Sequence, residues 1–206
     1  MAVMQASESN INFVKTRIAS PDGKLWGKAP GMVLMKPTSI DYSGTSATLG
    51  ENGQVTFNAV TSLSLNGCFT ADFDNYVVSI RSGNTTDANM SLRLRSSSTD
   101  DSGSNHTYQN IIVNGTAVSA GRGSSTTAWI LGTHGTNGKD GLTLNIYGPN
   151  LSQPTAGRWT GMTSYATVII NDSAFTHSLS NSYDGFTLFM ASGSVTGALT
   201  VYGVRS

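Results

Sequence analysis

Three histidines, His106, His134 and His177, are the residues of this sequence best suited to acid–base chemistry. Nucleophilic catalysis places a serine or cysteine beside a histidine whose ring is oriented by a carboxylate. All three histidines lie in polar stretches rich in glycine or serine, and His134 is expected in a loop. No Gly-X-Ser-X-Gly turn between a strand and a helix accompanies them. The sequence therefore offers no catalytic residues, and we predict that the protein is not an enzyme.

The sequence also contains few candidate ligands for a metal ion. The histidines are too far apart in the sequence for the closely spaced pairs of zinc motifs. Asp72, Asp74 and Asn75, or the pair Asp100 and Asp101, could supply oxygen ligands for calcium. The first of these stretches is more simply explained as a turn that leads into a strand. We predict no metal and no cofactor, and a structural calcium ion stays open.

The low content of charged residues limits the partners that the protein is expected to bind. Charged residues make up 12% of the 206 residues, and the formal net charge is zero. A neutral chain has no overall field that attracts nucleic acid or an anionic membrane, so we predict neither partner. Met1 to Val14 lacks the apolar run of a signal peptide, and no segment approaches the roughly 18 apolar residues of a membrane span. Synthesis in a cytoplasm is expected, with the single Cys68 as a buried, inert residue.

The first 41 residues are expected to form an extended N-terminal arm that anchors the protein. They carry four of the five lysines and three of the five prolines, which interrupt any strand-length alternation. Isolated apolar residues in this segment need a surface to pack against, which could be the protein's own domain, a sister subunit or a different protein. The arm residues expected to bind the partner are Phe13, Val14, Lys15, Arg17, Leu25, Trp26, Met32 and Leu34.

Residues 42–206 are expected to form one all-β domain. Apolar and polar residues alternate in Tyr76 to Arg81 and in Met90 to Arg95, which is typical of strands that bury one face. The loop Gly50-Glu-Asn-Gly53 favours a hairpin between strands 45–49 and 54–60. Further strands are expected at 107–113, 116–119, 127–131, 142–147, 163–170, 185–190 and 195–202, and polar loops at 96–106 and 120–126. Roughly eight to ten strands favour an antiparallel β-sandwich or jelly-roll-like fold.

Two groups of side chains on this domain are candidates for contacts. Arg93 and Arg95 lie on one face of their strand, and Arg81 extends that face if its strand is a neighbour. Such a patch could pair with acidic groups of a partner, or it could simply keep an edge of a sheet soluble. Four aromatic residues could form a shelf on which a sugar stacks, or belong to the core or a subunit contact: Trp129, Tyr147, Trp159 and Tyr165.

Two stretches resemble a class of structural proteins from tailed-bacteriophage virions. The first is Ser62-Leu-Ser-Leu-Asn-Gly-Cys-Phe-Thr-Ala-Asp-Phe-Asp-Asn-Tyr76, followed by Leu92-Arg-Leu-Arg95. The second is Asp184-Gly-Phe-Thr-Leu-Phe189 with Ser194-Val-Thr-Gly-Ala-Leu-Thr-Val-Tyr-Gly203. The resemblance covers most of the chain from about Thr45 onward and leaves the arm out. It implies a virion location, among decoration, knob or tail-fibre-associated proteins, and supplies no catalytic residues.

Taken with the arm, the resemblance favours a capsid decoration or cement protein. We expect it on the virion surface, bound to the major capsid protein or another virion protein, as a homo-oligomer with a trimer favoured. The alternative is a tail-fibre or receptor-binding module that recognises a host-surface glycan. A third hypothesis, a polysaccharide-degrading enzyme, finds no support because the acidic residues are scattered and identify no catalytic pair.

Overall fold

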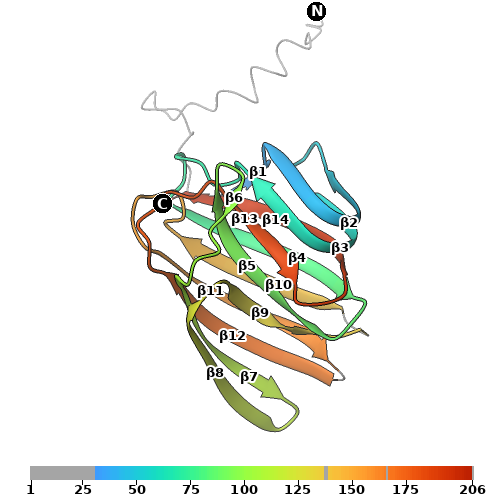
Figure 1. Cartoon of the computed structure of the whole chain (residues 1–206). Helices are drawn as coiled ribbons and strands as arrows, with labels where there is room; N and C mark the ends of the chain where they lie inside the picture. The colour runs from blue at the N-terminus through green and yellow to red at the C-terminus, as the bar shows by residue number, and fades with distance from the viewer. Residues whose placement is uncertain (1–30, 137–138, 166, 206) are drawn as a thin grey trace, which may run out of the picture.

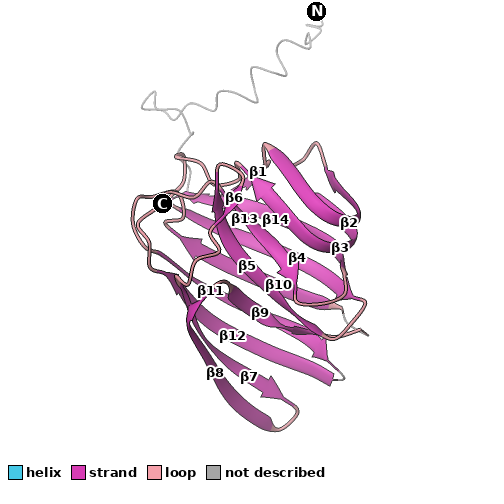
Figure 2. Ribbon diagram, in the orientation of Figure 1, coloured by secondary structure: helices cyan, strands magenta, loops and turns pink. Residues whose placement is uncertain are grey.

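The computed structural model describes residues 31–136, 139–165 and 167–205. This part of the chain contains fourteen β-strands and no helix (Figure 2), and every strand pair is antiparallel. The strands are β1 (Gly31–Met35), β2 (Ser39–Leu49), β3 (Val55–Asn66), β4 (Asn75–Asn84), β5 (Ala88–Ser96), β6 (Thr99–Asp100), β7 (His106–Asn114), β8 (Ala117–Thr126), β9 (Trp129–His134), β10 (Asp140–Tyr147), β11 (Thr155–Tyr165), β12 (Thr167–His177), β13 (Gly185–Met190) and β14 (Val195–Arg205).

These strands join in one curled sheet (Figure 1). The main path runs β6-β5-β13-β3-β14-β4-β10-β11-β12-β7-β8, with β1 on β14, β2 on β3 and β9 on β5. Strands that are distant in sequence therefore lie side by side, as where β14 separates β3 from β4. Such crossovers are typical of sandwich and jelly-roll folds and not of a simple meander. The predicted all-β, antiparallel, sandwich-like fold is confirmed.

Strand β3 bends the sheet because it changes partners along its length. Its residues 55–60 pair with β14, whereas residues 62–65 pair with β13. Between these halves Ala59 has a positive φ of 47°, and the pairing with β2 shifts register at Ser43 and Gly44. An irregularity of this kind bends and twists a strand. The bend lets β13 and β5 face β4 and β10 across a common core.

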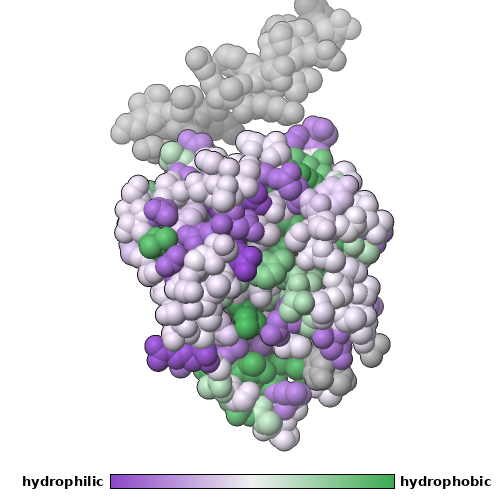
Figure 3. Space-filling view, viewed as in Figure 1, coloured by the Kyte–Doolittle hydropathy of each residue, from purple (hydrophilic) through white to green (hydrophobic). Residues whose placement is uncertain are grey.

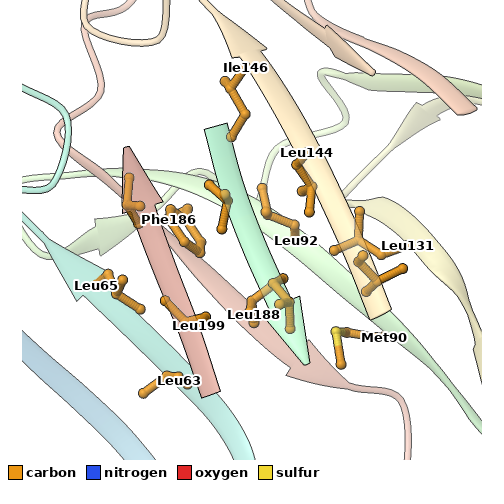
Figure 4. Packing of buried hydrophobic residues seen from close by; sticks show 14 of the residues in the cluster. Leu63, Leu65, Met90, Leu92, Leu131, Leu144, Ile146, Phe186, Leu188 and Leu199 are labelled. Carbon is orange, nitrogen blue, oxygen red and sulfur yellow. The ribbon is translucent and has the colours of Figure 1, made fainter. Parts of the chain in front are cut away.

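The core fills the space inside the curl. Figure 4 shows apolar side chains from β3, β5, β9, β10, β13 and β14 pointing into it. Alternation places them there: in β4, for example, Tyr76, Val78 and Ile80 are buried. Each fully buried large apolar side chain contributes roughly 1.5–3 kcal/mol. The core thus fixes the register of strands whose outer faces are free for other roles.

The structure corrects three local predictions. The stretch 163–170 is not one strand, because β11 ends at Tyr165 and β12 begins at Thr167. The stretch 120–126 is not a loop, because it belongs to β8 and pairs with β7. Within the described residues the sheet begins at Gly31, so that residues 31–35 and 39–41 of the expected arm lie in β1 and β2.

Candidate functional site

Strand β1 is where the predicted arm meets the folded sheet. Phe13, Val14, Lys15, Arg17, Leu25 and Trp26 lie outside the described residues. Met32 and Leu34 lie in β1, on one face of the strand, and their side chains are 61% and 38% exposed. Val33 points to the opposite face and is also exposed. The chain therefore enters the sheet through a strand that shows apolar side chains on both faces.

The edge of β1 is also open. Among the strands that the structure describes, β1 pairs with β14 alone, where Met32 lies opposite Val204 and Leu34 opposite Tyr202. A strand at an edge presents unpaired N–H and C=O groups to any chain that approaches it. The uncovered side chains and the open edge together make β1 a candidate attachment surface.

The three arginines of the predicted basic patch do not lie together. Arg81 lies on β4, and β13, β3 and β14 separate that strand from β5, which carries Arg93 and Arg95. Arg93 is half-buried: its Nε donates to the carbonyl of Thr127 at 2.8 Å and its guanidinium lies 4.5 Å from the ring centre of Phe189. These arginines therefore form no continuous face.

Arg95 is a structural residue. It is 5% exposed, and its Nη1 donates to the Thr187 hydroxyl at 2.9 Å and lies 3.4 Å from Asp100. Thr187 in turn donates to Asp100 at 2.6 Å and lies 2.8 Å from the Ser64 hydroxyl. A buried arginine needs such partners because an unpaired charge is costly away from water. The network fastens β6 to β5, β13 and β3, and a surface contact by Arg95 is not possible in this arrangement.

All three histidines are buried, and the prediction of a loop position for His134 is wrong. His134 ends β9, and its Nδ1 lies 2.7 Å from Asp140, with both side chains fully buried. The other oxygen of Asp140 accepts the Ser164 amide at 2.8 Å, and the His134 Nε2 lies 3.3 Å from the Leu131 carbonyl. This histidine–carboxylate pair resembles part of a catalytic triad, but its free nitrogen faces backbone and not a nucleophile. It ties β9 and β10 to β11.

The other two histidines form a second buried cluster. His106 and His177 lie directly opposite each other on β7 and β12, with ring centres 4.6 Å apart. The Tyr183 hydroxyl donates to Asp101 at 2.7 Å, and the same carboxylate lies 3.3 Å from His177 Nε2. The Trp129 ring packs 5.1 Å from His106. Sequence spacing gives no signal for this cluster, because cross-strand pairing and a loop bring its members together.

Burial controls protonation in this cluster. Burial, together with the neighbouring His177, lowers the pKa of His106 to about 4 from an ordinary 6.5. Burial also lowers the pKa of His177. For Asp101, burial opposes ionisation, but the hydrogen bonds from Tyr183 and the Gly103 amide, together with His177, outweigh it and lower the pKa. At neutral pH the cluster therefore holds two uncharged imidazoles beside one carboxylate.

The single cysteine and two of the four aromatic residues expected to stack on a sugar are buried. Cys68 is fully buried, and burial raises the pKa of its thiol, so the expectation of an inert core cysteine fits its place. Trp129 and Trp159 are fully buried as well and cannot serve as a sugar-stacking shelf, whereas Tyr147 is 47% exposed. Nothing is described for the side chain of Tyr165.

A shallow open groove of about 290 Å³ lies on the sheet surface formed by β7, β8 and β12. Its lining residues are mostly polar or small: Thr107, Tyr108, Gln109, Arg122, Ala174, Phe175 and Thr176. Figure 3 shows that much of the visible surface has intermediate hydropathy, with scattered polar and apolar groups. A groove of this kind suits weak contacts made by hydrogen bonds.

Neither a metal centre nor a relative points to a function. Within residues 31–136, 139–165 and 167–205, no three His, Cys, Asp or Glu side chains come together as ligands for a metal ion. None of the described segments is a helix long and apolar enough to cross a membrane. A comparison with protein-family models finds no match, and neither does a comparison with curated proteins.

Proposed function

We propose that this chain is a non-enzymatic structural protein of a phage virion, a decoration or cement protein that binds the head through its N-terminal arm. The observation that carries the proposal is β1, because apolar side chains on both of its faces stand uncovered at the point where residues 1–30 join the sheet. A partner that takes up the arm would also cover this strand. The resemblance of segments such as Ser62 to Tyr76 to virion structural proteins supports the same assignment.

The buried histidines support a role without catalysis. General acid–base chemistry requires a titratable group within reach of a substrate, whereas His106, His134 and His177 are sealed in the core. The proposed partner is the major capsid protein or another virion protein, and the proposed location is the virion surface. The trimeric state stays a prediction.

The test is binding of a truncated chain to phage particles that lack this protein. The truncation removes residues 1–30 and stops before β1, because a longer deletion would remove a strand from the sheet. We expect the full chain to bind in many copies over the head, and the truncated chain to fold but to lose binding at least tenfold. A second variant, the full chain with Met32→Ser and Leu34→Ser, tests the contribution of β1 itself. Tyr147→Ser is the control, because it changes an exposed residue away from β1. Full occupancy by the truncated chain would show that the arm is not the anchor.

A second candidate function is glycan recognition by a tail module. The groove beside Arg122 and Gln109 favours it, since hydroxyl, amide and guanidinium groups together suit hydrogen bonding to a sugar. Copy number separates the two candidates: labelled protein at the tail in a few copies supports the tail module, and hundreds of copies over the head support decoration. Release of sugar from host envelope by the purified chain would contradict both.

A further inference from the structure

Four aliphatic residues form a continuous row across the outer face of the sheet. Val118 of β8 lies opposite Val113 of β7, which lies opposite Ile170 of β12, which lies opposite Met162 of β11. Residues directly opposite in antiparallel strands share a face and lie about 5 Å apart. Val118 is 71% exposed, Ile170 58% and Met162 38%. We call these four residues the aliphatic row.

Further exposed apolar residues extend the aliphatic row on the same face. Ile111 lies two positions before Val113 on β7, and Val168 lies two positions before Ile170 on β12, so each points outward like its neighbour. Both are more than half exposed. Contiguous apolar surface of this kind on a soluble protein marks a place of contact.

The inner face of the same strands carries polar residues where a core is usually apolar. In β12 the buried positions include Asn171, Ser173 and His177. In β7 they include His106 and Asn110. These strands therefore bury polar side chains beside apolar ones such as Ile169 and Phe175, and they expose aliphatic side chains where a sheet with one solvated face has polar ones. The exposed aliphatic side chains are explained if the outer face is itself covered in the working state of the protein.

We propose that a second copy of this chain covers the aliphatic row, packing face to face about a two-fold axis. A two-fold contact uses the same patch on both copies, and the aliphatic row is suited to it because its members carry no charge. Four strands about 4.8 Å apart and three outward residues per strand give a central area of roughly 400 Å², within which the six aliphatic residues lie. The whole outer face of these strands, about ten residues long, adds up to about 650 Å², close to the ~800 Å² per partner of a standard interface.

Charge at the rim favours a second copy over the chain's own arm. On this face Arg122 makes no hydrogen bond or ion pair within the described residues, and Asp172 bonds to Arg158 while its side chain stays 39% exposed. Two copies related by a two-fold axis can place Arg122 of one near Asp172 of the other. Residues 1–30 carry four basic and two acidic residues, and would bring net positive charge to a face that already has two arginines and one aspartate.

The test is the mass of the full chain in solution, measured by light scattering over a range of concentrations. We expect a species of twice the 21.6-kDa chain mass, and a trimer, which the sequence favours, would contradict the two-fold contact. Ile170→Asp and Val118→Asp should each weaken association at least tenfold. Tyr42→Asp is the matched control, because Tyr42 is 46% exposed on β2, a strand that lies outside both the aliphatic row and β1. Circular dichroism and the melting temperature of each variant show that loss of association is not loss of folding.

A cysteine at position 170 gives an independent measurement. Cys68 is fully buried, so Ile170→Cys supplies the one reactive thiol, and a short bismaleimide should link two chains of this variant but not of Tyr42→Cys. A monomeric full chain at millimolar concentration, or association that survives both aspartate variants, overturns the proposal. So does a monomer that dimerises only after residues 1–30 are removed, because that result makes the arm the cover of the aliphatic row.

Discussion

The middle of the curled sheet differs from the end formed by β12, β7 and β8, which we call the β7–β12 end, in how polar and apolar residues are divided between its two faces. In β4 the pattern is ordinary, since Val78 is buried and the adjacent Ser79 is exposed. In β12 the pattern is mixed, since Asn171 and His177 are buried beside Ile169, and Ile170 is exposed. The same alternating backbone geometry produces both patterns. The exposed aliphatic side chains of the β7–β12 end are the basis of the proposal that its outer face makes a contact.

The polar interior of the β7–β12 end depends on specific hydrogen bonds. The Asn171 amide donates to Thr163 at 3.1 Å, and the Ser173 hydroxyl donates to the Gln109 carbonyl at 3.0 Å. Buried groups of this kind are stable only when they are paired. Aromatic packing by Trp129, whose Nε1 donates to the Thr176 carbonyl at 2.9 Å, keeps this region closed to water.

The largest expected effect comes from Trp129→Ala. Trp129 is fully buried and packs 4.2 Å from the Phe175 ring, so its removal leaves a large cavity and frees the Thr176 carbonyl. We expect a loss of about 3–5 kcal/mol in the free energy of unfolding, measured by urea titration. Hydrogen exchange should speed up in β7, β8 and β12 more than in β4 and β10. Equal acceleration throughout would mean that the two regions are one cooperative unit, and Tyr147→Ala at an exposed site controls for aromatic loss as such.

The second prediction is loss of stability in mild acid, caused by the buried histidines of the β7–β12 end. The pKa of His106 is about 4 in the folded state and 6.5 in its ordinary state, so the unfolded chain binds more protons between these values. The contribution is therefore complete above pH 6.5 and is lost as the pH falls toward 4; the lowered pKa of His177 acts in the same direction. We expect a loss on the order of 2 kcal/mol between pH 7 and pH 4. Asp101, with its lowered pKa, adds a further loss only in stronger acid.

The variant His106→Gln separates this effect from general acid sensitivity. Glutamine keeps a polar side chain but does not titrate, so the unfolding free energy should change less with pH even if its value at pH 7 is lower. Urea titrations at pH 7.5, 5.5 and 4 give the comparison. An unchanged slope in the variant would exclude His106 as the source.

Sequence patterning predicted the middle of the sheet better than its β7–β12 end. The hairpin at Gly50 to Gly53 and the strands around Val78 and Leu92 follow from alternation and an Asn-Gly turn, both of which are local signals. The first residues of β8 lie in the predicted strand 116–119, but its continuation through 120–126 was missed because Gly121 and Gly123 are typical of loops. In the structure these glycines make room for cross-strand neighbours, since a Cβ on either would lie 2.4 Å from a side-chain atom of β7.

The candidate sites were harder to predict than the fold. Alternation placed Arg93 and Arg95 on one face of β5, but only the strand order shows that three strands lie between them and Arg81. The His106–His177 pair depends on which strands become neighbours, which no local pattern contains. The aliphatic row was hidden for a related reason: without the register, residues such as Val118 and Ile170 are read as core.

The smallest expected effect comes from a pair of substitutions at neighbouring residues of β12, and this pair tests most directly whether the exposed apolar face serves a contact. Ile169 and Ile170 are adjacent in β12, but the first is 6% exposed and faces inward, and the second is 58% exposed and faces outward. Threonine is β-branched like isoleucine, so Ile→Thr keeps the strand propensity at either position. Ile169→Thr buries a hydroxyl and removes buried methyl surface, and should cost about 2 kcal/mol in urea titrations.

Ile170→Thr should change the free energy of the isolated chain by no more than about 0.5 kcal/mol. This value must be measured in dilute protein, where association contributes nothing. As the concentration rises, the wild-type chain should gain stability by mass action while Ile170→Thr lags behind it. A concentration-independent difference at position 170 would mean that the outer face already stabilises the single chain. The contrast between the two neighbours therefore reports directly whether the exposed apolar surface of the β7–β12 end belongs to the fold or to a contact between copies.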